Sequence, residues 1–181
     1  MSRRYRLLNW GDCAGRSRPF WLLLAASALL LLSAACYLQY AIEIAPCVFC
    51  IYQRVALCGS LLAALIALLQ PRFGWLRGSA LLLWSYSAWR GLQVAWIQTQ
   101  LQKGGAPWLI CPFKPQFPEW LPLDRWLPWL FEATGECHLA TPTLLYLTIP
   151  QWLLLLFTFY LLLGLWLITA PLGLMALQSP K

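Results

Sequence analysis

The sequence predicts an all-α membrane protein, an up-down bundle of four transmembrane helices with two outer loops. The 181-residue chain is 61% hydrophobic and only 10% charged, whereas an ordinary soluble domain is about 25% charged. Four apolar stretches each approach the roughly 20 residues that cross a bilayer. Basic residues gather before the first stretch and between the second and third, as the positive-inside rule predicts for cytoplasmic segments. We therefore expect a single membrane domain over residues 1–181.

The four helices are expected in the order in which the apolar stretches occur. They span about residues 19–37, 51–69, 78–97 and 149–170. The short segment Gln70–Arg77 between the second and third helices implies antiparallel neighbours, as in an up-down bundle. Small residues such as Gly59 and Ala63 favour close packing of the second helix in lipid. With four crossings, both termini lie on the side that the arginines mark as cytoplasmic.

The outer loops are the most polar parts of the chain. They cover about residues 39–50 and 98–148. They hold five of the six acidic residues, and the second loop is rich in proline, so long regular structure is not expected there. One short helix fits residues 123–132, because Leu123, Leu127 and Phe131 share a helical face and a proline precedes them. This helix would lie flat at the membrane surface. An irregular loop with aromatic side chains is the alternative.

The first apolar stretch also has features of a cleaved signal peptide. A basic segment precedes it, and Ser33-Ala34-Ala35 before Cys36 resembles a lipoprotein cleavage site. The stretch is longer than the roughly 7–15 residues of a signal core, so we expect it to remain as a helix. The net charge of +7 would suit nucleic acid. Because the arginines lie beside apolar stretches, we expect the lipid bilayer as a partner and no nucleic acid.

A C-x-x-C motif lies at the start of the second predicted helix. Cys47 and Cys50 lie one turn apart if the helix begins near Cys47, and Arg54 follows on the same face. A guanidinium and a helix N-terminus both favour the thiolate, which is the reactive form in disulfide exchange. Arg54 would also hold the oxygen of a quinone head group as the ring gains negative charge. The alternatives are a static disulfide that caps the helix, and a metal site with His138, whose spacing suits zinc poorly.

Cys111 and Cys137 form a second candidate pair in the proline-rich outer loop. They lie 26 positions apart on the oxidising side of the membrane. As a plain cross-link, a disulfide between them would contribute about 3 kcal/mol of stability, which is the alternative to a redox role. The nearby C-x-x-C favours the redox role, because disulfide exchange passes electrons between neighbouring pairs. We interpret the remaining cysteines, Cys13, Cys36 and Cys58, as bystanders.

These residues resemble the signature of the DsbB family, the quinone-linked disulfide-bond formation proteins of the bacterial inner membrane. The resemblance is strongest in the sequence PCVFCIYQR of Pro46–Arg54. It covers nearly the whole chain, because further matching segments are Leu8–Cys13, Tyr86–Gln93, Phe117–Trp126, Gly135-Glu136-Cys137 and Pro150–Leu154.

The resemblance implies a membrane protein-dithiol:quinone oxidoreductase with cytoplasmic termini and periplasmic active cysteines. Cys111 would form a mixed disulfide with a periplasmic DsbA-like protein of the thioredoxin fold. Cys137 would then exchange with Cys47. Cys50 would pass the electrons to ubiquinone or menaquinone near Arg54, and the quinone pool would return them to the respiratory chain. The redox disulfides would be Cys47–Cys50 and Cys111–Cys137, and neither a metal nor a flavin is expected.

Four features depart from the family pattern or remain open. Gln53 stands where Glu is common, and Gln98 aligns with a His at the end of the third helix. Gln98 is still a candidate cofactor-binding residue, because its amide can hydrogen-bond a quinone although it carries no proton charge. Arg90, halfway along the third predicted helix, is either a second charge for the quinone or a structural charge. The chain also lacks a strongly basic C-terminal tail.

Three other functions remain open alongside this prediction. A protein of the vitamin K epoxide reductase type also combines a C-x-x-C in a helix bundle with loop cysteines, although its helix order usually differs. A DsbB-like paralogue dedicated to one client would share all the residues named above. A non-enzymatic membrane scaffold would use its cysteines only in structural disulfides. Cys50→Ser separates the scaffold from the enzyme, because the enzyme would lose quinone reduction and keep its fold.

Overall fold

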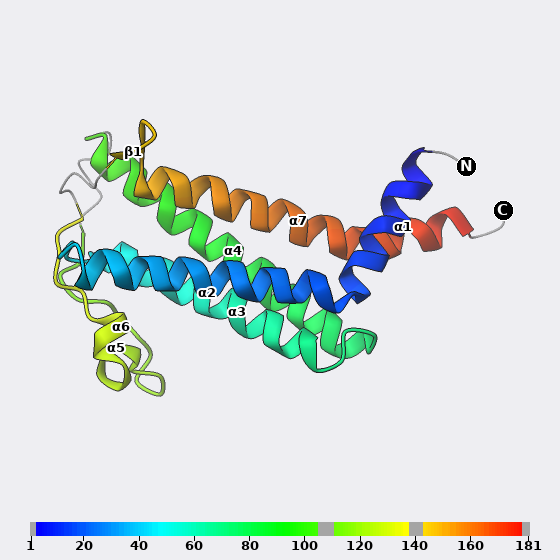
Figure 1. Ribbon diagram of the computed structural model, residues 1–181, viewed down its shortest axis with the longest axis horizontal. Coiled ribbons are helices and arrows are strands. Elements are labelled where there is room, and N and C mark those ends of the chain that lie inside the picture. Colours follow the sequence, from blue (N-terminus) through cyan, green and yellow to red (C-terminus); the bar gives the residue numbers. More distant parts are fainter. Residues whose placement is uncertain (1–2, 105–110, 138–142, 179–181) are drawn as a thin grey trace.

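The computed structural model describes residues 3–104, 111–137 and 143–178, and these parts of the chain are mainly helical. Figure 1 shows four long helices side by side along the longest axis, with two short helices at one end and the N-terminal helix at the other. The elements in order are α1 (Arg3–Arg16), α2 (Arg18–Tyr40), α3 (Val48–Leu69), α4 (Gly74–Gln102), α5 (Leu123–Trp126), α6 (Pro128–Phe131), β1 (Thr143–Leu144), β2 (Leu147–Thr148) and α7 (Ile149–Gln178).

Among the described residues, three helices are long and apolar enough to cross a membrane. They are α2, α3 and the part of α7 up to Pro171, with mean hydropathies of 2.1, 1.7 and 2.3. The expected helical membrane protein is thus confirmed. The predicted third crossing, residues 78–97, lies within α4, which is as long but carries Arg90, Gln93 and Gln98. The four-crossing arrangement therefore stays a prediction.

The long helices pack in the order α2, α3, α4, α7 around a buried core. In that core the rings of Trp84 and Tyr160 lie edge to face. Between α4 and α7, Gly91 leaves the space that Phe157 fills, since a Cβ at Gly91 would collide with that ring. A 2.6 Å hydrogen bond between the hydroxyls of Ser27 and Tyr160 links α2 to α7. Small and aromatic residues thus complement each other where the helices meet.

The N-terminal segment, which the sequence analysis treats only as a basic tail, is the helix α1. It packs against α7, where Gly11 leaves no room for a side chain. Asp12 forms ion pairs with Arg16 at 2.9 Å and with Arg77 of α4 at 3.3 Å. α7 continues to Gln178, past residue 170 where the sequence predicts its end, and its Gly173 contacts Leu8 of α1. The i, i+4 spacing of Asp12 and Arg16 is a helix signal that the sequence contained.

The outer segment differs from the single short helix predicted for residues 123–132. It forms two separate helical turns, α5 and α6, with a break at Leu127. Pro128 disfavours helical backbone in the residue before it, and Leu127 accordingly has φ −135° and ψ 63°. Phe131 belongs to the same buried cluster as Ile51 near the start of α3. The segment therefore covers the end of α3 that carries the C-x-x-C motif.

A short antiparallel hairpin leads into α7, and the all-helical prediction does not include it. β1 pairs with β2 through Thr143–Thr148 and Leu144–Leu147. The two turn residues, Leu145 and Tyr146, have φ of 50° and 67°. Leucine and tyrosine rarely adopt this left-handed backbone, so these residue types do not indicate a tight turn.

Candidate functional site

The C-x-x-C motif forms the start of α3. Cys47 is the N-cap residue with extended backbone, and Cys50 lies in the first turn. The Cys50 backbone N–H donates to Cys47 Sγ at 3.3 Å and so satisfies one of the open donors of the helix N-terminus. Both cysteines are free thiols, with their Sγ atoms 2.8 Å apart. The hydrogen bond with Cys50 and burial both raise the pKa of the Cys47 thiol.

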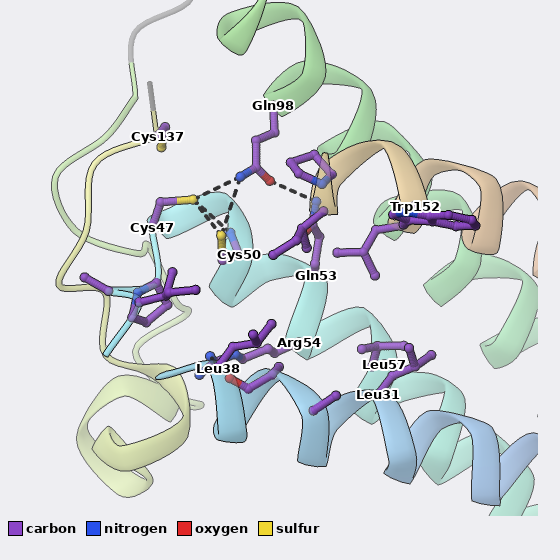
Figure 2. Close-up of a pocket in the computed structure, with 18 of the residues that line it drawn as sticks. Leu31, Leu38, Cys47, Cys50, Gln53, Arg54, Leu57, Gln98, Cys137 and Trp152 are labelled. Carbon is purple, nitrogen blue, oxygen red and sulfur yellow. Dashed lines mark hydrogen bonds between the residues drawn. The ribbon is translucent and has the colours of Figure 1, made fainter. Parts of the chain in front are cut away.

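Two glutamine side chains from different helices meet beside the cysteine pair. Gln98 Nε2 of α4 lies 3.3 Å from Cys47 Sγ and 3.5 Å from Cys50 Sγ, and donates to both. Gln53 Nε2 of α3 donates to Gln98 Oε1 at 3.0 Å. Both amides are almost fully buried, with Gln53 2% and Gln98 1% exposed. Figure 2 shows this series of hydrogen bonds, which ends on the two sulfur atoms.

Arg54 lies one helical turn beyond Cys50 and connects three segments of the chain. Its Nη1 donates to Gln39 Oε1 at 2.7 Å and to the Leu130 carbonyl oxygen at 2.9 Å. Its Nη2 donates to the Ala35 carbonyl oxygen at 3.1 Å. These three acceptors are uncharged, and the side chain is buried. The guanidinium thus holds the end of α2 and α6 in place while it brings a permanent positive charge to this end of α3.

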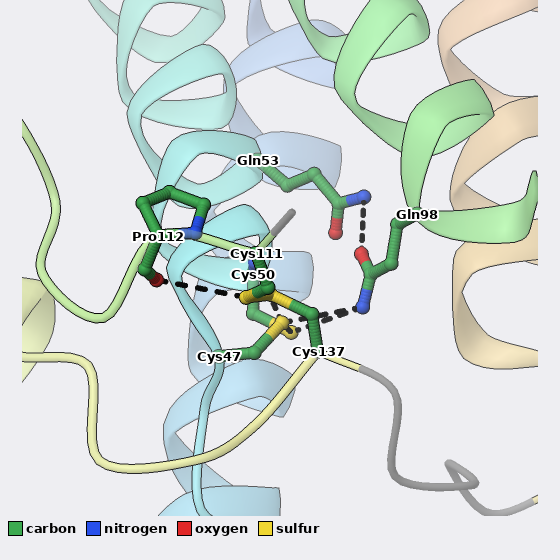
Figure 3. The surroundings of a disulfide bond; sticks show 7 residues. All are labelled: Cys47, Cys50, Gln53, Gln98, Cys111, Pro112 and Cys137. Atoms are coloured by element: carbon green, nitrogen blue, oxygen red, sulfur yellow. Dashed lines mark hydrogen bonds between the residues drawn. A yellow bond between two sulfur atoms is a disulfide. The ribbon is translucent and has the colours of Figure 1, made fainter. Parts of the chain in front are cut away.

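Cys111 and Cys137 are joined by a disulfide that links two parts of the outer loop. Their Cα atoms are 5.9 Å apart, within the usual range. Cys137 is buried, whereas Cys111 is partly exposed. Cys137 lines the same cavity as Cys47 and Cys50, and Figure 3 shows the disulfide beside the C-x-x-C motif. The structure therefore brings together all four cysteines that the sequence analysis places in the site.

Backbone hydrogen bonds hold the outer loop against the start of α3. The N–H groups of Thr134 and Gly135 both donate to the Pro46 carbonyl oxygen at 3.0 Å. Pro46 immediately precedes Cys47, and Gly135 lies two residues before the loop cysteine. A Cβ at Gly135 would collide with the Ala45 carbonyl group, so glycine permits this close approach. This contact is not among the sequence-based predictions, although a glycine so close to a candidate cysteine is a signal for it.

A cavity of about 510 Å³ opens beside the cysteine pair. Its polar groups come from the cysteines, Gln53, Arg54, Gln98 and Glu136, and the rest of its wall is apolar. Figure 2 shows lining side chains that converge from four helices, such as Leu31 of α2, Arg54 of α3, Gln98 of α4 and Trp152 of α7. A mostly apolar cavity of this size with a few polar groups is typical of small-molecule sites. The apolar wall consists of Leu31, Ala34, Ala35, Leu38, Ile44, Ala45, Pro46, Leu57, Ile149, Pro150, Trp152 and Leu153.

The other candidate residues lie outside the cavity lining. Arg90 is exposed on α4 and donates to Gln93 Oε1 at 3.0 Å. Within residues 3–104, 111–137 and 143–178, no three side chains of the metal-ligating types form a cluster. His138 lies outside the described residues. The cysteines interpreted as bystanders are free thiols, namely Cys13, Cys36 and Cys58.

The sequence matches known proteins over most of its length. The family model described as Disulfide bond formation protein DsbB matches residues 17–167. The chain belongs to the DsbB family. A disulfide bond formation protein B from Photorhabdus laumondii is 46% identical over 156 residues, which cover 86% of this chain and 90% of the relative. The protein of the same name from Aeromonas salmonicida is 46% identical over 145 residues, covering 80% of this chain and 84% of the relative.

Membership in the DsbB family confirms the resemblance drawn from the PCVFCIYQR segment and the loop motifs. A third relative, from Salmonella typhimurium, is 43% identical over 155 residues, covering 86% of this chain and 88% of the relative. The DsbB family implies a disulfide oxidoreductase in a membrane. All four site cysteines, Arg54 and both glutamines lie within the matched residues.

Proposed function

We propose that this chain oxidises a periplasmic dithiol protein and delivers the electrons to a membrane quinone. The donor is a DsbA-like protein of the thioredoxin fold, and the acceptor is ubiquinone or menaquinone from the respiratory pool. The observation that carries the proposal is the meeting of Cys47, Cys50 and Cys137 at one apolar cavity that also contains Arg54. Transfer from protein thiols to an apolar acceptor requires exchangeable cysteine pairs beside a cavity of this kind.

Electrons enter at the Cys111–Cys137 disulfide. A thiolate of the donor protein attacks Cys111, forms a mixed disulfide and releases Cys137 as a thiolate. The second thiol of the donor then resolves the mixed disulfide, so that the donor leaves oxidised and Cys111 is a thiolate. The partial exposure of Cys111 supports this role, because an outside protein must reach its sulfur atom.

The electrons then pass to the C-x-x-C pair. The released Cys137 attacks Cys47 of the Cys47–Cys50 disulfide and frees Cys50, and Cys111 then attacks Cys137 and frees Cys47. The net result is a donor disulfide, a re-formed Cys111–Cys137 disulfide and a Cys47/Cys50 dithiol. This last combination is the one present in the structure, and the contact of Thr134 and Gly135 with Pro46 supports short-range exchange between the pairs.

The cavity suits a quinone as the acceptor. When bound, a quinone accepts two electrons and two protons. The apolar wall would hold its ring and chain, and Arg54, which lines the cavity, would hold a ring oxygen. Gln98 is a further donor at the wall, although its amide already contacts both sulfurs. Cys50 is the cysteine that would pass the electrons to the acceptor in this proposal, as the family resemblance implies, and Arg54 lies one helical turn beyond it.

The proposed topology places the site at the periplasmic face of the bacterial inner membrane. α4 is the third of the four crossings, since it packs between α3 and α7 along the bundle. The arginine-rich α1 and both termini then lie on the cytoplasmic side, while the cysteine pairs lie at the opposite end of the bundle (Figure 1). The segment that forms α5 and α6 lies at the same end as the cysteines.

A coupled assay tests the proposed reaction. The purified chain in detergent receives a reduced DsbA-like protein and a soluble ubiquinone analogue, and quinone absorbance is followed. We expect catalytic loss of the quinone signal in wild type and in the control Cys13→Ser, and none in Cys50→Ser or Cys111→Ser. Turnover that survives Cys50→Ser would contradict the proposal. A small dithiol in place of the protein donor should restore turnover to Cys111→Ser, since it reduces the C-x-x-C pair directly.

A further inference from the structure

We infer that Gln98 stabilises the reduced form of the Cys47/Cys50 pair and that Gln53 sets the direction of the Gln98 amide. The inference rests on the proposed function, because it assigns a catalytic residue and a positioning residue to the same site. It is carried by the series of hydrogen bonds from Gln53 through Gln98 to both sulfur atoms.

The Gln98 amide presents its donor end to the sulfurs. An amide has a donor end, the NH₂ group, and an acceptor end, the carbonyl oxygen. A thiolate only accepts hydrogen bonds, so the Nε2 end stabilises it and the Oε1 end repels it. Nε2 lies 3.3 Å from Cys47 Sγ and 3.5 Å from Cys50 Sγ. The NH₂ end therefore faces both sulfur atoms and stabilises whichever of them is deprotonated.

Gln53 decides which end of the Gln98 amide faces the sulfurs. Its Nε2 donates to Gln98 Oε1 at 3.0 Å and so keeps that oxygen turned away from the cysteines. Both side chains are buried, so water competes little for these groups. A side chain at position 53 that cannot donate would release the amide, and its oxygen could then turn toward the sulfurs. Gln53 thus acts on the cysteine pair through Gln98.

This arrangement predicts a shift in a redox equilibrium. One Cys47–Cys50 disulfide and two glutathione molecules yield the Cys47/Cys50 dithiol and one glutathione disulfide. Hydrogen bonds to the reduced sulfurs favour the dithiol side and make the pair a stronger oxidant. We expect their loss to move the equilibrium constant toward the Cys47–Cys50 disulfide by about five-fold, the effect of one typical hydrogen bond.

A double-mutant cycle with methionine, which resembles glutamine in length but has no amide, tests this inference. Protein with Cys111→Ser and Cys137→Ser is equilibrated in glutathione buffers, and its thiols are counted by alkylation and intact mass. Gln98→Met should shift the equilibrium about five-fold and Gln53→Met about two-fold. The double variant should match Gln98→Met alone. Gln93→Met on α4, whose amide pairs with Arg90, is the matched control and should leave the equilibrium unchanged.

Two results would overturn the inference. A wild-type equilibrium in Gln98→Met would remove the role of Gln98, and a Gln53→Met effect that persists in the Gln98→Met background would remove the positioning role of Gln53. If Gln98→Met does not fold, Gln98→Asn applies the same test, because its amide is one methylene too short to reach the sulfurs. The equilibrium needs neither quinone nor a protein donor, so the inference and the proposed function can fail separately.

Discussion

Arg54 contacts three segments of the chain and lines the cavity beside the cysteines, so its removal has two separable effects. Arg54→Ala takes a charged donor from three oxygens and should lower the free energy of unfolding by about 2 kcal/mol. It also removes the positive charge that we propose to hold a quinone oxygen, so the quinone KM should rise about ten-fold. Thermal unfolding in detergent and steady-state quinone titration measure the two effects.

Arg90→Ala is the matched control for this prediction. Arg90 is exposed, lies outside the cavity lining and pairs with Gln93, so its loss should change the quinone KM less than two-fold. An Arg54→Ala protein with lowered stability and an unchanged KM would leave Arg54 a purely structural role.

The sequence predicted the candidate residues better than their contacts. Cys47, Cys50 and Arg54 lie at intervals of three and four along one helix, so helix geometry alone places them together. Gln98 is 45 positions from Gln53, and their hydrogen bond depends on how α3 and α4 pack. From the sequence, both glutamines are only departures from a family pattern, with no sign that they contact each other.

At the scale of elements, the outer loop depends on glycine where it contacts the segment before α3. Gly135→Ala should push the loop away from the Ala45 carbonyl and weaken the hydrogen bonds to Pro46. Because this separates the two cysteine pairs, we expect turnover with a protein donor to fall about ten-fold. Turnover driven by a small dithiol that reduces Cys47–Cys50 directly should stay within two-fold of wild type.

The control for the loop prediction is Gly78→Ala on α4, because a Cβ at this position meets open space. Its turnover with the protein donor and with the small dithiol should both equal those of wild type. Equal losses with both donors in Gly135→Ala would indicate general damage to the site. Wild-type turnover with the protein donor would show that this backbone contact does not govern exchange.

The helix α1 should contribute stability without affecting the chemistry. Asp12 pairs with Arg16 and with Arg77, and its side chain is only 16% exposed. Asp12→Asn weakens both ion pairs and should lower the free energy of unfolding by about 1 kcal/mol, with unchanged quinone kinetics. Glu119→Gln, on an exposed outer residue, should alter neither quantity. An Asp12→Asn protein with wild-type stability but altered quinone kinetics would contradict a purely structural role for α1.

The sequence predicted the helices best where burial of apolar side chains in lipid alone determines them. Long apolar stretches predicted α2, α3 and α7, because burial in lipid requires helices of that length. The break at Leu127 lay within reach of sequence reasoning, since Pro128 restricts the residue before it. The helix α1 and the extension of α7 past Pro171 depend on contact with each other, and a local pattern does not show such contacts.

At the scale of the whole molecule, the proposed topology puts the two ends of the bundle on opposite sides of the membrane. An impermeant maleimide added to spheroplasts should label a cysteine introduced by Phe113→Cys, since Phe113 is 93% exposed beside the site. The native Cys13 on α1 is exposed and should react only after the membrane is permeabilised. Equal labelling of both positions before permeabilisation would contradict four crossings.

Composition and charge distribution were sufficient to predict a helical membrane protein, because soluble domains rarely combine such low charge with apolar stretches of this length. They were not sufficient for the number of crossings. α4 carries glutamines and two arginines, and the Gln98 amide is placed by the neighbouring helix α3, which a sequence window does not include. The cavity likewise depends on α2, α3, α4 and α7 together, so its existence could be expected only from family resemblance.

The measurement that tests the central claim most directly is whether Cys47 and Cys137 bond to each other. In the double variant Cys50→Ser and Cys111→Ser, these two residues lose their usual partners and line the same cavity. We predict that mild oxidation yields a Cys47–Cys137 disulfide, detected by mass spectrometry of the digested protein. If both cysteines remain thiols under conditions that form Cys111–Cys137 in wild type, the two pairs do not exchange electrons as proposed.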